Sequence, residues 1–184
     1  MPIAMPKHGD GFVLRSFTPA DAELLAEIEF DREVKRYLAV PEKDKQQWIQ
    51  EFSHELGYGW AVEASHDGTL AGRASISRSA KKGEGELVIV ISKAFWGYKL
   101  GRKVAALLIP AAFKELEAKA LVAIVHPENQ ASLDLLKFWK FKYCGTNKTP
   151  AKPWQKGHLV FRLTREAYNH SVKATGASKS VPAA

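Results

Sequence analysis

Two glycines and a group of cations stand where a strand pattern gives way to a helix pattern, in the stretch ISKAFWGYKLGRKVAALLIPAAF at residues 91–113. Gly97 and Gly101 lie in the turn. The helix that follows carries three cations near its start: Lys99, Arg102 and Lys103. The first amides of a helix have no partner inside it, and the aligned peptide dipoles make that end partly positive, so an anion binds there. Glycine lets the backbone approach such a ligand closely. The stretch is therefore a candidate pyrophosphate site.

The same residues also have a purely structural interpretation. Two glycines allow tight packing of a turn, and cations suit the solvated side of a helix. Gly97 and Gly101 are too close together for the phosphate loop G-x-x-x-x-G-K-[ST], and G-x-G-x-x-G is not matched either. Spacing alone leaves both interpretations open.

Cysteine and histidine usage gives little sign of redox or metal chemistry. Cys144 is the single cysteine, which excludes an internal disulfide, favours a cytoplasmic protein and fits a small packing residue. The six histidines show no H-x₃-H spacing and there is no C-x₂-C pair, so we expect no metal site. No apolar run reaches the ~18–20 residues that a membrane-spanning helix needs, and we expect neither a membrane role nor a secretory leader.

The net charge of +7 favours an anionic partner: a nucleotide-bearing cofactor, a nucleic acid or an acidic substrate. Basic and aromatic residues alternate in KFWKFKYCGTNKTPAKPWQK at residues 137–156, a pattern found in single-strand binders. The alternative, which we favour, is a solvated edge whose aromatics belong to the core. Nucleic acid binding is thus the less favoured interpretation.

Apolar periodicity divides the chain into strands and helices. We expect strands at residues 12–17, 60–64, 69–78, 86–92, 120–126 and 158–164. We expect helices at 18–30 (capped by Thr18), 31–38, 43–56, 131–141 and from about residue 100 onwards. Antiparallel candidates come first and alternating strands and helices afterwards, which predicts one α+β domain over residues 1–170. Residues 171–184 have almost nothing to bury, so we expect a disordered tail.

Several motifs in this order resemble the GNAT superfamily of acyl-CoA-dependent N-acetyltransferases, in particular the branch of ribosomal-protein N-terminal alanine and serine acetyltransferases. FVLRSFTPADA is similar to LxLRxxxxxDA, and DREVKRYL to DPEVxRYL. ELVIVISKAFWGYKLGRKVA aligns without gaps with EIGYxLxxxYWGKGYATEAL, and VHPENQASLDLLKFWKF with VHPxNxASxxLLEKLGF. The resemblance covers roughly residues 12–165. It implies the GNAT fold: a single mixed, mostly antiparallel sheet flanked by helices, with a V-shaped splay between the fourth and fifth expected strands, 86–92 and 120–126.

The resemblance also implies where acetyl-CoA binds. The pantetheine arm would pair with the backbone of Val90 and Ile91, and Asn129 would hydrogen-bond the arm or its cysteamine end, with Ser132 beside it. The pyrophosphate would lie on the turn formed by Trp96, Gly97, Tyr98, Lys99, Leu100, Gly101 and Arg102. Without the family, Asn129 is simply a helix cap and Ser132 an early helical residue, and both roles can hold together.

The sequence departs from the family pattern at four positions. Lys99 replaces the middle glycine of the turn, Pro110 lies inside the cofactor helix where it should kink it, and Lys140 replaces a glycine before Phe141. Leu136 stands where many relatives carry a tyrosine that protonates the leaving thiolate.

The implied reaction is direct attack of a primary amine on the thioester in a ternary complex. Glu86 is the candidate general base, because strand alternation puts it on one face with Val88 and Val90; a solvating charge at a strand edge is the alternative. The oxyanion would be held by the amide of Val90 or Ile91. Ser132, Tyr143 or water would protonate the thiolate.

Three functions follow in order of preference. The first is acetyl-CoA-dependent N-acetylation of a small molecule or a protein N-terminus; the second is a catalytically weak acyl-CoA sensor; the third is nucleic acid binding. The acceptor would be shaped by residues of about 30–58 and 145–157, with Trp48, Tyr58, Trp60 and Trp154 as candidate lining residues. A homodimer is compatible with the sequence.

Overall fold

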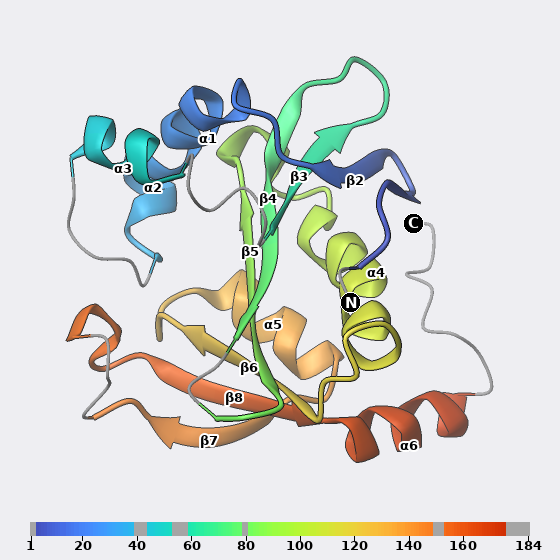
Figure 1. The fold of residues 1–184 in the computed structure, drawn as a ribbon. Coiled ribbons are helices and arrows are strands. Elements are labelled where there is room, and N and C mark those ends of the chain that lie inside the picture. Colours follow the sequence, from blue (N-terminus) through green and yellow to red (C-terminus); the bar gives the residue numbers. More distant parts are fainter. Residues whose placement is uncertain (1–2, 39–43, 53–58, 79–80, 149–152, 176–184) are drawn as a thin grey trace.

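The computed structural model describes residues 3–38, 44–52, 59–78, 81–148 and 153–175, which build an eight-stranded sheet in the order β1-β2-β3-β4-β5-β6-β8-β7 (Figure 1). The strands are β1 (Lys7–Gly9), β2 (Phe12–Ser16), β3 (Gly59–Ala64), β4 (Leu70–Arg78), β5 (Glu84–Ile91), β6 (Ala120–Val125), β7 (Lys142–Thr146) and β8 (Leu159–Thr164). The helices are α1 (Asp21–Phe30), α2 (Arg32–Lys35), α3 (Lys45–Phe52), α4 (Leu100–Lys114), α5 (Gln130–Phe138) and α6 (Arg165–Thr175), with short 3₁₀ turns η1 (Lys93–Phe95) and η2 (Pro153–Gln155). The expected mixed α+β sheet is confirmed.

All six expected strands are present, and the structure adds two that the sequence did not reveal. Both lie at the edges of the sheet: β1 has three residues, and β7 pairs only with β8 among the described strands. Most of the β7 residues are exposed, so the strand carries no alternation of apolar and polar side chains. Backbone pairing with the neighbouring strand, which has no signature in side-chain periodicity, forms these strands.

The helices pack on both faces of the sheet and bury two cores. On one face, Val104, Leu108 and Ile109 of α4 join residues of α5, α6 and the sheet in the larger core. On the other face, Leu25 of α1 and Phe52 of α3 pack with β3 and β4 residues. Neighbouring β3 residues divide between the two, since Val62 belongs to the larger core and Ala61 to the smaller one.

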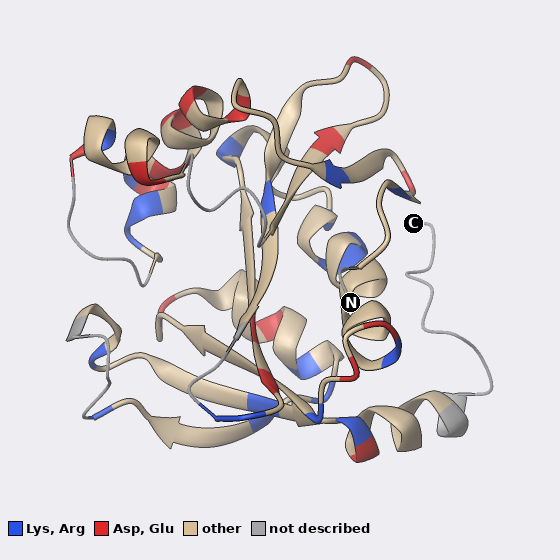
Figure 2. Cartoon of the chain, viewed as in Figure 1, with Lys and Arg blue, Asp and Glu red and all other residues tan. Residues whose placement is uncertain are grey.

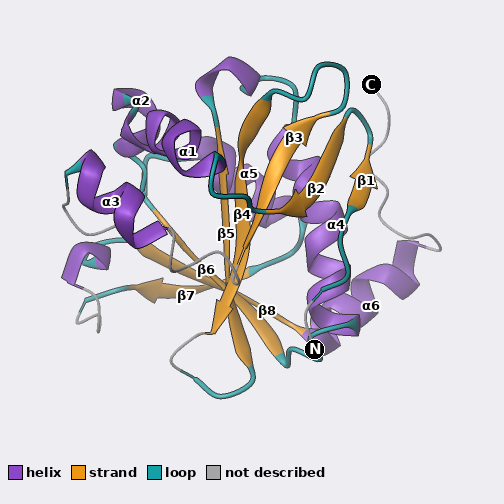
Figure 3. Ribbon diagram, turned by 45° about the horizontal axis from the view of Figure 1, so that its top comes forward, coloured by secondary structure: helices purple, strands orange, loops and turns teal. Residues whose placement is uncertain are grey.

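β5 and β6 are the one parallel pair of the described sheet, and their pairing is short. The register runs from Glu84–Ala120 to Glu86–Val122 and stops there, although β5 continues to Ile91 and β6 to Val125. Beyond Glu86 and Val122 the two strands diverge (Figure 3). These are the fourth and fifth strands of the expected fold, so the V-shaped splay is confirmed.

The C-terminal boundary needs a correction. Residues 171–175 were expected to begin a disordered tail, but they form the last part of α6. Tyr168 of this helix stacks on Phe113 of α4, with ring centroids 4.9 Å apart, so the helix is docked on the larger core. Residues 176–184 lie outside the described residues.

The start of α1 is built on a buried carboxylate. Asp21 is 3% exposed, and its oxygens accept hydrogen bonds from two guanidinium nitrogens of Arg15, each at 2.8 Å. The carboxylate also accepts hydrogen bonds from the amide and the hydroxyl of Thr18. Thr18 was expected to cap the helix, but it donates to Asp21 instead, and the N-cap residue is Ala20. Burial alone would raise the pKa of Asp21, but these hydrogen bonds outweigh it and hold the pKa below the ordinary 3.8.

We expect Asp21→Asn to lower the free energy of unfolding by about 2–3 kcal/mol, because it leaves Arg15 without its main buried partner. A lowered carboxyl pKa stabilises the fold above the unfolded value, and this contribution is lost as pH falls below 3.8 towards the folded value. The variant should therefore lose less stability than the wild type over that interval. Urea unfolding at several pH values measures both effects. Asp10→Asn, at an exposed ion pair with Lys103, is the control and should change stability by less than ~1 kcal/mol.

Two lysines that replace family glycines adopt the left-handed conformation that a glycine would take. Lys99 has φ 55° and Lys140 has φ 63°. At the end of α5, the amide of Lys140 donates to the carbonyl of Lys137 and the amide of Phe141 to that of Leu136. This is the Schellman arrangement, which usually has glycine at the position of Lys140. Both lysines thus hold a backbone conformation that glycine usually adopts, at a conformational cost.

Lys140→Gly should raise the free energy of unfolding by about 0.5–1 kcal/mol, because relief of the left-handed strain exceeds the added flexibility of the unfolded chain. Lys137→Gly, at an exposed helical position three residues earlier, should instead lower it by about 1 kcal/mol. Opposite signs in denaturant unfolding would support the assignment, and equal losses would contradict it.

Candidate functional site

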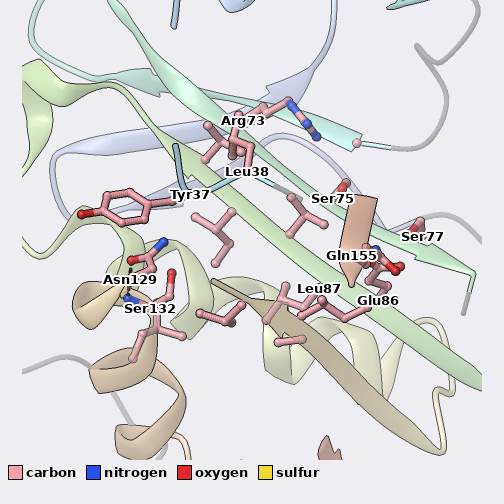
Figure 4. A pocket seen from close by; sticks show the side chains of 18 of the residues that line it. Tyr37, Leu38, Arg73, Ser75, Ser77, Glu86, Leu87, Asn129, Ser132 and Gln155 are labelled. Atoms are coloured by element: carbon pink, nitrogen blue, oxygen red, sulfur yellow. Dashed lines mark hydrogen bonds between the residues drawn. The ribbon is translucent and has the colours of Figure 1, made fainter. Parts of the chain in front are cut away.

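The divergence of β5 and β6 opens a cleft of about 520 Å³ that runs across the middle of the sheet (Figure 4). Four sets of residues line it. They are Arg73, Ser75 and Ser77 of β4 with Glu86–Val90 of β5; Ala123–Val125 of β6 with Asn129, Ser132, Leu135 and Leu136; Tyr37 and Leu38 after α2; and Phe17, Phe52, Gly59, Trp154 and Gln155 at the other end.

Side chains of β5 alternate between the core and the cleft. Leu87, Ile89 and Ile91 pack on the larger core, so the residues between them face the opposite side. On that side β5 and β4 residues stand in directly opposed pairs: Glu86 with Ser77, Val88 with Ser75, and Val90 with Arg73. All six line the cleft. The expected common face of Glu86, Val88 and Val90 is therefore present, and Glu86 looks into the opening.

The backbone of β5 alternates in the other sense. The amide of Ser92 donates to the carbonyl of Ala71 at 2.8 Å, so the antiparallel ladder makes the next bonded pair Val90 with Arg73. The N–H and C=O of Val90 thus point to β4, whereas those of Ile89 and Ile91 point towards the opening. The expected use of the Val90 backbone is inconsistent with this register, because the backbone groups that face the opening are those of Ile89 and Ile91. The carbonyl of Ile91 already accepts from the indole Nε1 of Trp96 at 2.9 Å.

The turn before α4 is shaped for close approach of a ligand to the backbone. Gly97 has φ 87° and Lys99 is the left-handed N-cap of α4. Leu100 and Gly101 occupy the first turn of the helix, where an amide has no intrahelical partner. The amide of Arg102 donates to the carbonyl of Lys99 at 2.9 Å. Tyr98 is 71% exposed and Trp96 40%, so this turn lies at the surface end of the splay.

The three cations of the turn point to different places. The guanidinium of Arg102 lies over the ring of Phe138 on α5, 5.3 Å from its centroid, which fixes its charge in the groove between α4 and α5. Lys103 instead forms an ion pair with Asp10 at 2.7 Å, beside the β1–β2 turn. Lys99 is exposed. Of the two charges placed by contacts, only that of Arg102 lies beside α5.

Asn129 caps α5 at the inner end of the cleft. Its side-chain oxygen accepts from the amide of Ser132 at 3.1 Å, which leaves the two N–H groups of the side-chain amide for another partner (Figure 4). Both residues line the cleft. The capping interpretation of Asn129 is confirmed, and its position allows the second role as well.

The outer end of the cleft holds Glu86 and residues that sequence patterns did not single out. At this end Glu86 accepts a hydrogen bond from Nε2 of the buried Gln155 at 3.2 Å. Farther along the cleft, Arg73 stands opposite Val90 and pairs with the buried Glu29 of α1. Trp154 lines the outer end with Phe52. Gln155 follows a proline-rich stretch and Arg73 lies mid-strand, so neither carried a motif; only long-range contacts reveal them.

Of the other proposed acceptor residues, Trp48 stacks on Phe52 with ring centroids 5.0 Å apart and Trp60 packs against the larger core. Tyr58 lies outside the described residues.

One further expectation is changed by the structure. Tyr143 lies on β7, 57% exposed, with its hydroxyl 3.2 Å from Oγ1 of Thr146, and it does not line the cleft. α4 continues through Pro110 to Lys114, and Pro110 lies ten residues beyond Leu100, about 15 Å along the axis from the turn. Leu136 is buried in the larger core.

The aromatic residues Trp139 and Phe141 of the basic stretch are 1% and 7% exposed, so they belong to the core and offer no surface for stacked bases. Among the described residues, no cluster of three or more histidine, cysteine or acidic side chains could hold a metal ion. Over the same residues, no helix is both long and apolar enough to cross a bilayer.

Comparison with known proteins agrees with this architecture. Residues 12–142 match the family model of the acetyltransferase (GNAT) domain. A GNAT-family acetyltransferase from Bacillus anthracis superposes with a TM-score of 0.76 at 16% identity, over 88% of this chain and 99% of that one. The ribosomal-protein-S5-alanine acetyltransferase from Vibrio fischeri gives 0.68 at 15% identity, over 90% and 99%. Mycobacterium smegmatis RimJ in complex with CoA-disulfide gives 0.67 at 17%, over 90% and 89%.

The sheet diverges at the parallel pair β5–β6, and α4 begins beside this divergence. This arrangement defines an acyltransferase of the GNAT fold. The chain belongs to the GNAT acetyltransferase family.

The capping role of Asn129 predicts a specific pattern of stability. Asn129→Ala should lower the free energy of unfolding by about 1 kcal/mol, because the amide of Ser132 loses its acceptor. Asn129→Asp keeps an acceptor oxygen and should change stability by less than ~0.5 kcal/mol. Urea unfolding of the two variants checks this. Equal losses of unfolding free energy in both variants would show that the acceptor oxygen of the cap does not stabilise the helix.

Proposed function

We propose that the protein is an acetyl-CoA-dependent N-acetyltransferase that transfers the acetyl group to a primary amine by direct attack in a ternary complex. One observation carries the proposal: beyond Glu86, the edge of β5 that pairs with no described strand leads to the amides at the start of α4. A strand edge suits an amide-bearing arm such as pantetheine, and a helix start suits the pyrophosphate to which that arm is joined.

In this arrangement the pantetheine arm pairs with the carbonyl of Ile89 and the amide of Ile91. The pyrophosphate lies on the turn that comprises Trp96, Gly97, Tyr98, Lys99, Leu100, Gly101 and Arg102. Arg102 contributes its charge, because contact with Phe138 holds it between α4 and α5. Asn129 donates to the cysteamine end with the amide hydrogens that its cap does not use. Trp96 acts indirectly: its indole N–H donates to the carbonyl of Ile91, so that this carbonyl is not available to the pantetheine arm.

The amine must lose a proton before it attacks, because an α-amine has an ordinary pKa near ~8 and a lysine amine near ~10.4. Glu86 is the proposed base, acting directly or through water, and Gln155 orients its carboxylate. The amide of Ile89 donates to the oxyanion, since it faces the opening while the Val90 amide faces β4; the carbonyl of Ile89 and the amide of Ile91 are then the groups that pair with the pantetheine arm. Ser132 stays beside the cysteamine end.

The acceptor enters at the end lined by Glu86, Trp154 and Phe52. Although the net charge of the chain is positive, acidic side chains gather over α1 and α2 (Figure 2), which lie beside the other end of β5, as the ion pair of Glu33 with Lys93 shows. At the acceptor end itself, the carboxylate that lines the cleft is that of Glu86, and it attracts a cationic acceptor such as a protonated amine. Relatives described as ribosomal-protein acetyltransferases favour a protein N-terminus over a small molecule.

A catalytically weak acyl-CoA sensor is the second candidate, motivated by Lys99, Pro110 and Leu136. Two of these three departures leave the site intact, because Lys99 keeps a glycine-like backbone and Pro110 lies far along α4. Release of the CoA thiol on addition of amines and of peptides with free N-termini distinguishes the two: turnover with any acceptor supports the enzyme, and binding without turnover across the panel supports the sensor.

Calorimetry with acetyl-CoA tests the placement of the cofactor. We expect Arg102→Ala to weaken binding about 10- to 100-fold, since a charge-assisted contact to phosphate contributes about 1.5–3 kcal/mol. Lys103→Ala removes the neighbouring positive charge, which is paired with Asp10, and should leave affinity within about threefold. Equal losses of acetyl-CoA affinity in the two variants would mean that Arg102 contributes only general positive charge. Absence of binding by the wild type would refute the proposed function.

A further inference from the structure

Breaking the thioester leaves a thiolate on the cofactor, and that sulfur needs a proton. The described residues of the cleft offer four hydroxyl groups: Tyr37, Ser75, Ser77 and Ser132. Ser75 and Ser77 stand opposite Val88 and Glu86, towards the acceptor end. Tyr37 and Ser132 lie at the end closed by Asn129, where the proposed function puts the cysteamine.

Contacts on two sides hold the ring of Tyr37 at this end of the cleft. The guanidinium of Arg36 lies 4.9 Å from the ring centroid, and the ring of His126 meets it edge-on at 5.8 Å. Arg36 in turn bonds Glu128 at 2.9 Å, which ties the segment after α2 to the loop between β6 and α5. That loop also carries Asn129, whose amide donates to the carbonyl of His126 at 2.9 Å. Tyr37 therefore packs beside the short loop that carries Asn129.

The hydroxyl of Tyr37 has no hydrogen-bond partner within the described part of the chain, although the residue is half-buried. Figure 4 shows the phenol beside Asn129 and Ser132, with its oxygen directed away from Glu86 and Gln155. A clamped ring with an unused hydroxyl suits a group that donates to a bound ligand.

We propose that Tyr37 is the general acid of the reaction. The acceptor nitrogen bonds to the acetyl carbon, the C–S bond breaks with its electron pair on sulfur, and the Tyr37 O–H gives its proton to the sulfur to form the CoA thiol. The proton that the amine loses returns to the phenolate through solvent. This inference rests on the proposed function.

Chemistry favours the phenol over the alternatives. A phenol has an ordinary pKa near ~10 and a thiol one near ~8.5, whereas a serine hydroxyl is a far weaker acid, so Ser132 is poorly matched to the task. Leu136 carries no proton, and Tyr143 lies outside the cleft.

The charged and titratable groups around Tyr37 are Arg36, Glu128, His126 and His158. Arg36 lies over the face of the ring, where a positive charge stabilises the phenolate that forms during the transfer. Glu128 forms an ion pair with Arg36 and so balances part of that charge. His158 packs edge-on against His126 at 5.4 Å, and its burial lowers the pKa of its imidazole.

The test compares Tyr37→Phe and Tyr143→Phe with the wild type, first by calorimetry with acetyl-CoA and then by kcat with the acceptor found in the screen. Tyr37→Phe should keep acetyl-CoA affinity within about threefold and lower kcat about 100-fold, the usual contribution of a general acid. Tyr143→Phe removes the same hydroxyl at an exposed site and should leave both unchanged. Incorporation of 3-fluorotyrosine at position 37, which makes the phenol more acidic, should move the alkaline limb of kcat to lower pH.

A kcat of Tyr37→Phe within threefold of the wild type would overturn the assignment, and so would an alkaline limb that 3-fluorotyrosine does not move. A loss confined to acetyl-CoA affinity would also overturn it and make Tyr37 a binding residue. These outcomes are distinct from failure of the wild type to bind acetyl-CoA, which would refute the proposed function itself.

Discussion

The early end of the β5–β6 pairing is the constraint on which the rest of the site depends. Parallel pairing stops at Glu86 and Val122, while both strands continue. Backbone groups inside a protein need partners, so the unpaired edge of β5 is stable only where solvent or a ligand reaches it. The same divergence brings side chains of β4, β5, β6 and α5 around one cleft. The free edge of β5 and the cleft beside it thus both result from the early end of the β5–β6 pairing.

The termini of α4 and α5 that flank the splay tolerate substitutions that a sequence pattern would judge severe. Lysine takes the left-handed conformation of glycine at both Lys99 and Lys140. At the second position, two backbone hydrogen bonds and the burial of Phe141 and Leu136 outweigh the strain. Tertiary packing therefore holds both lysines in a backbone conformation that glycine usually adopts.

Charge is distributed by contacts and not by position in the chain. Arg102 and Lys103 are neighbours, yet one lies over Phe138 and the other pairs with Asp10. On the far side of the sheet, Arg73 is neutralised by the buried Glu29, and Glu86 is held by Gln155. The proposed donor end thus keeps a placed positive charge, whereas the proposed acceptor end has one oriented carboxylate.

Local patterns by themselves determined the six main strands, the order of the helices, the turn before α4 and the cap at Asn129, because these depend on residues close together in the chain. The family resemblance added the splay. Only the tertiary structure showed that Val90 pairs with β4 while Ile89 faces the opening, since this depends on strand register. It also placed Tyr37 and Gln155 in the cleft, through the Arg36–Glu128 pair and the bond to Glu86. The edge strands β1 and β7 could not be predicted from the sequence because backbone pairing forms them. The length of α6 could not be predicted either, because this helix is stabilised by docking on Phe113.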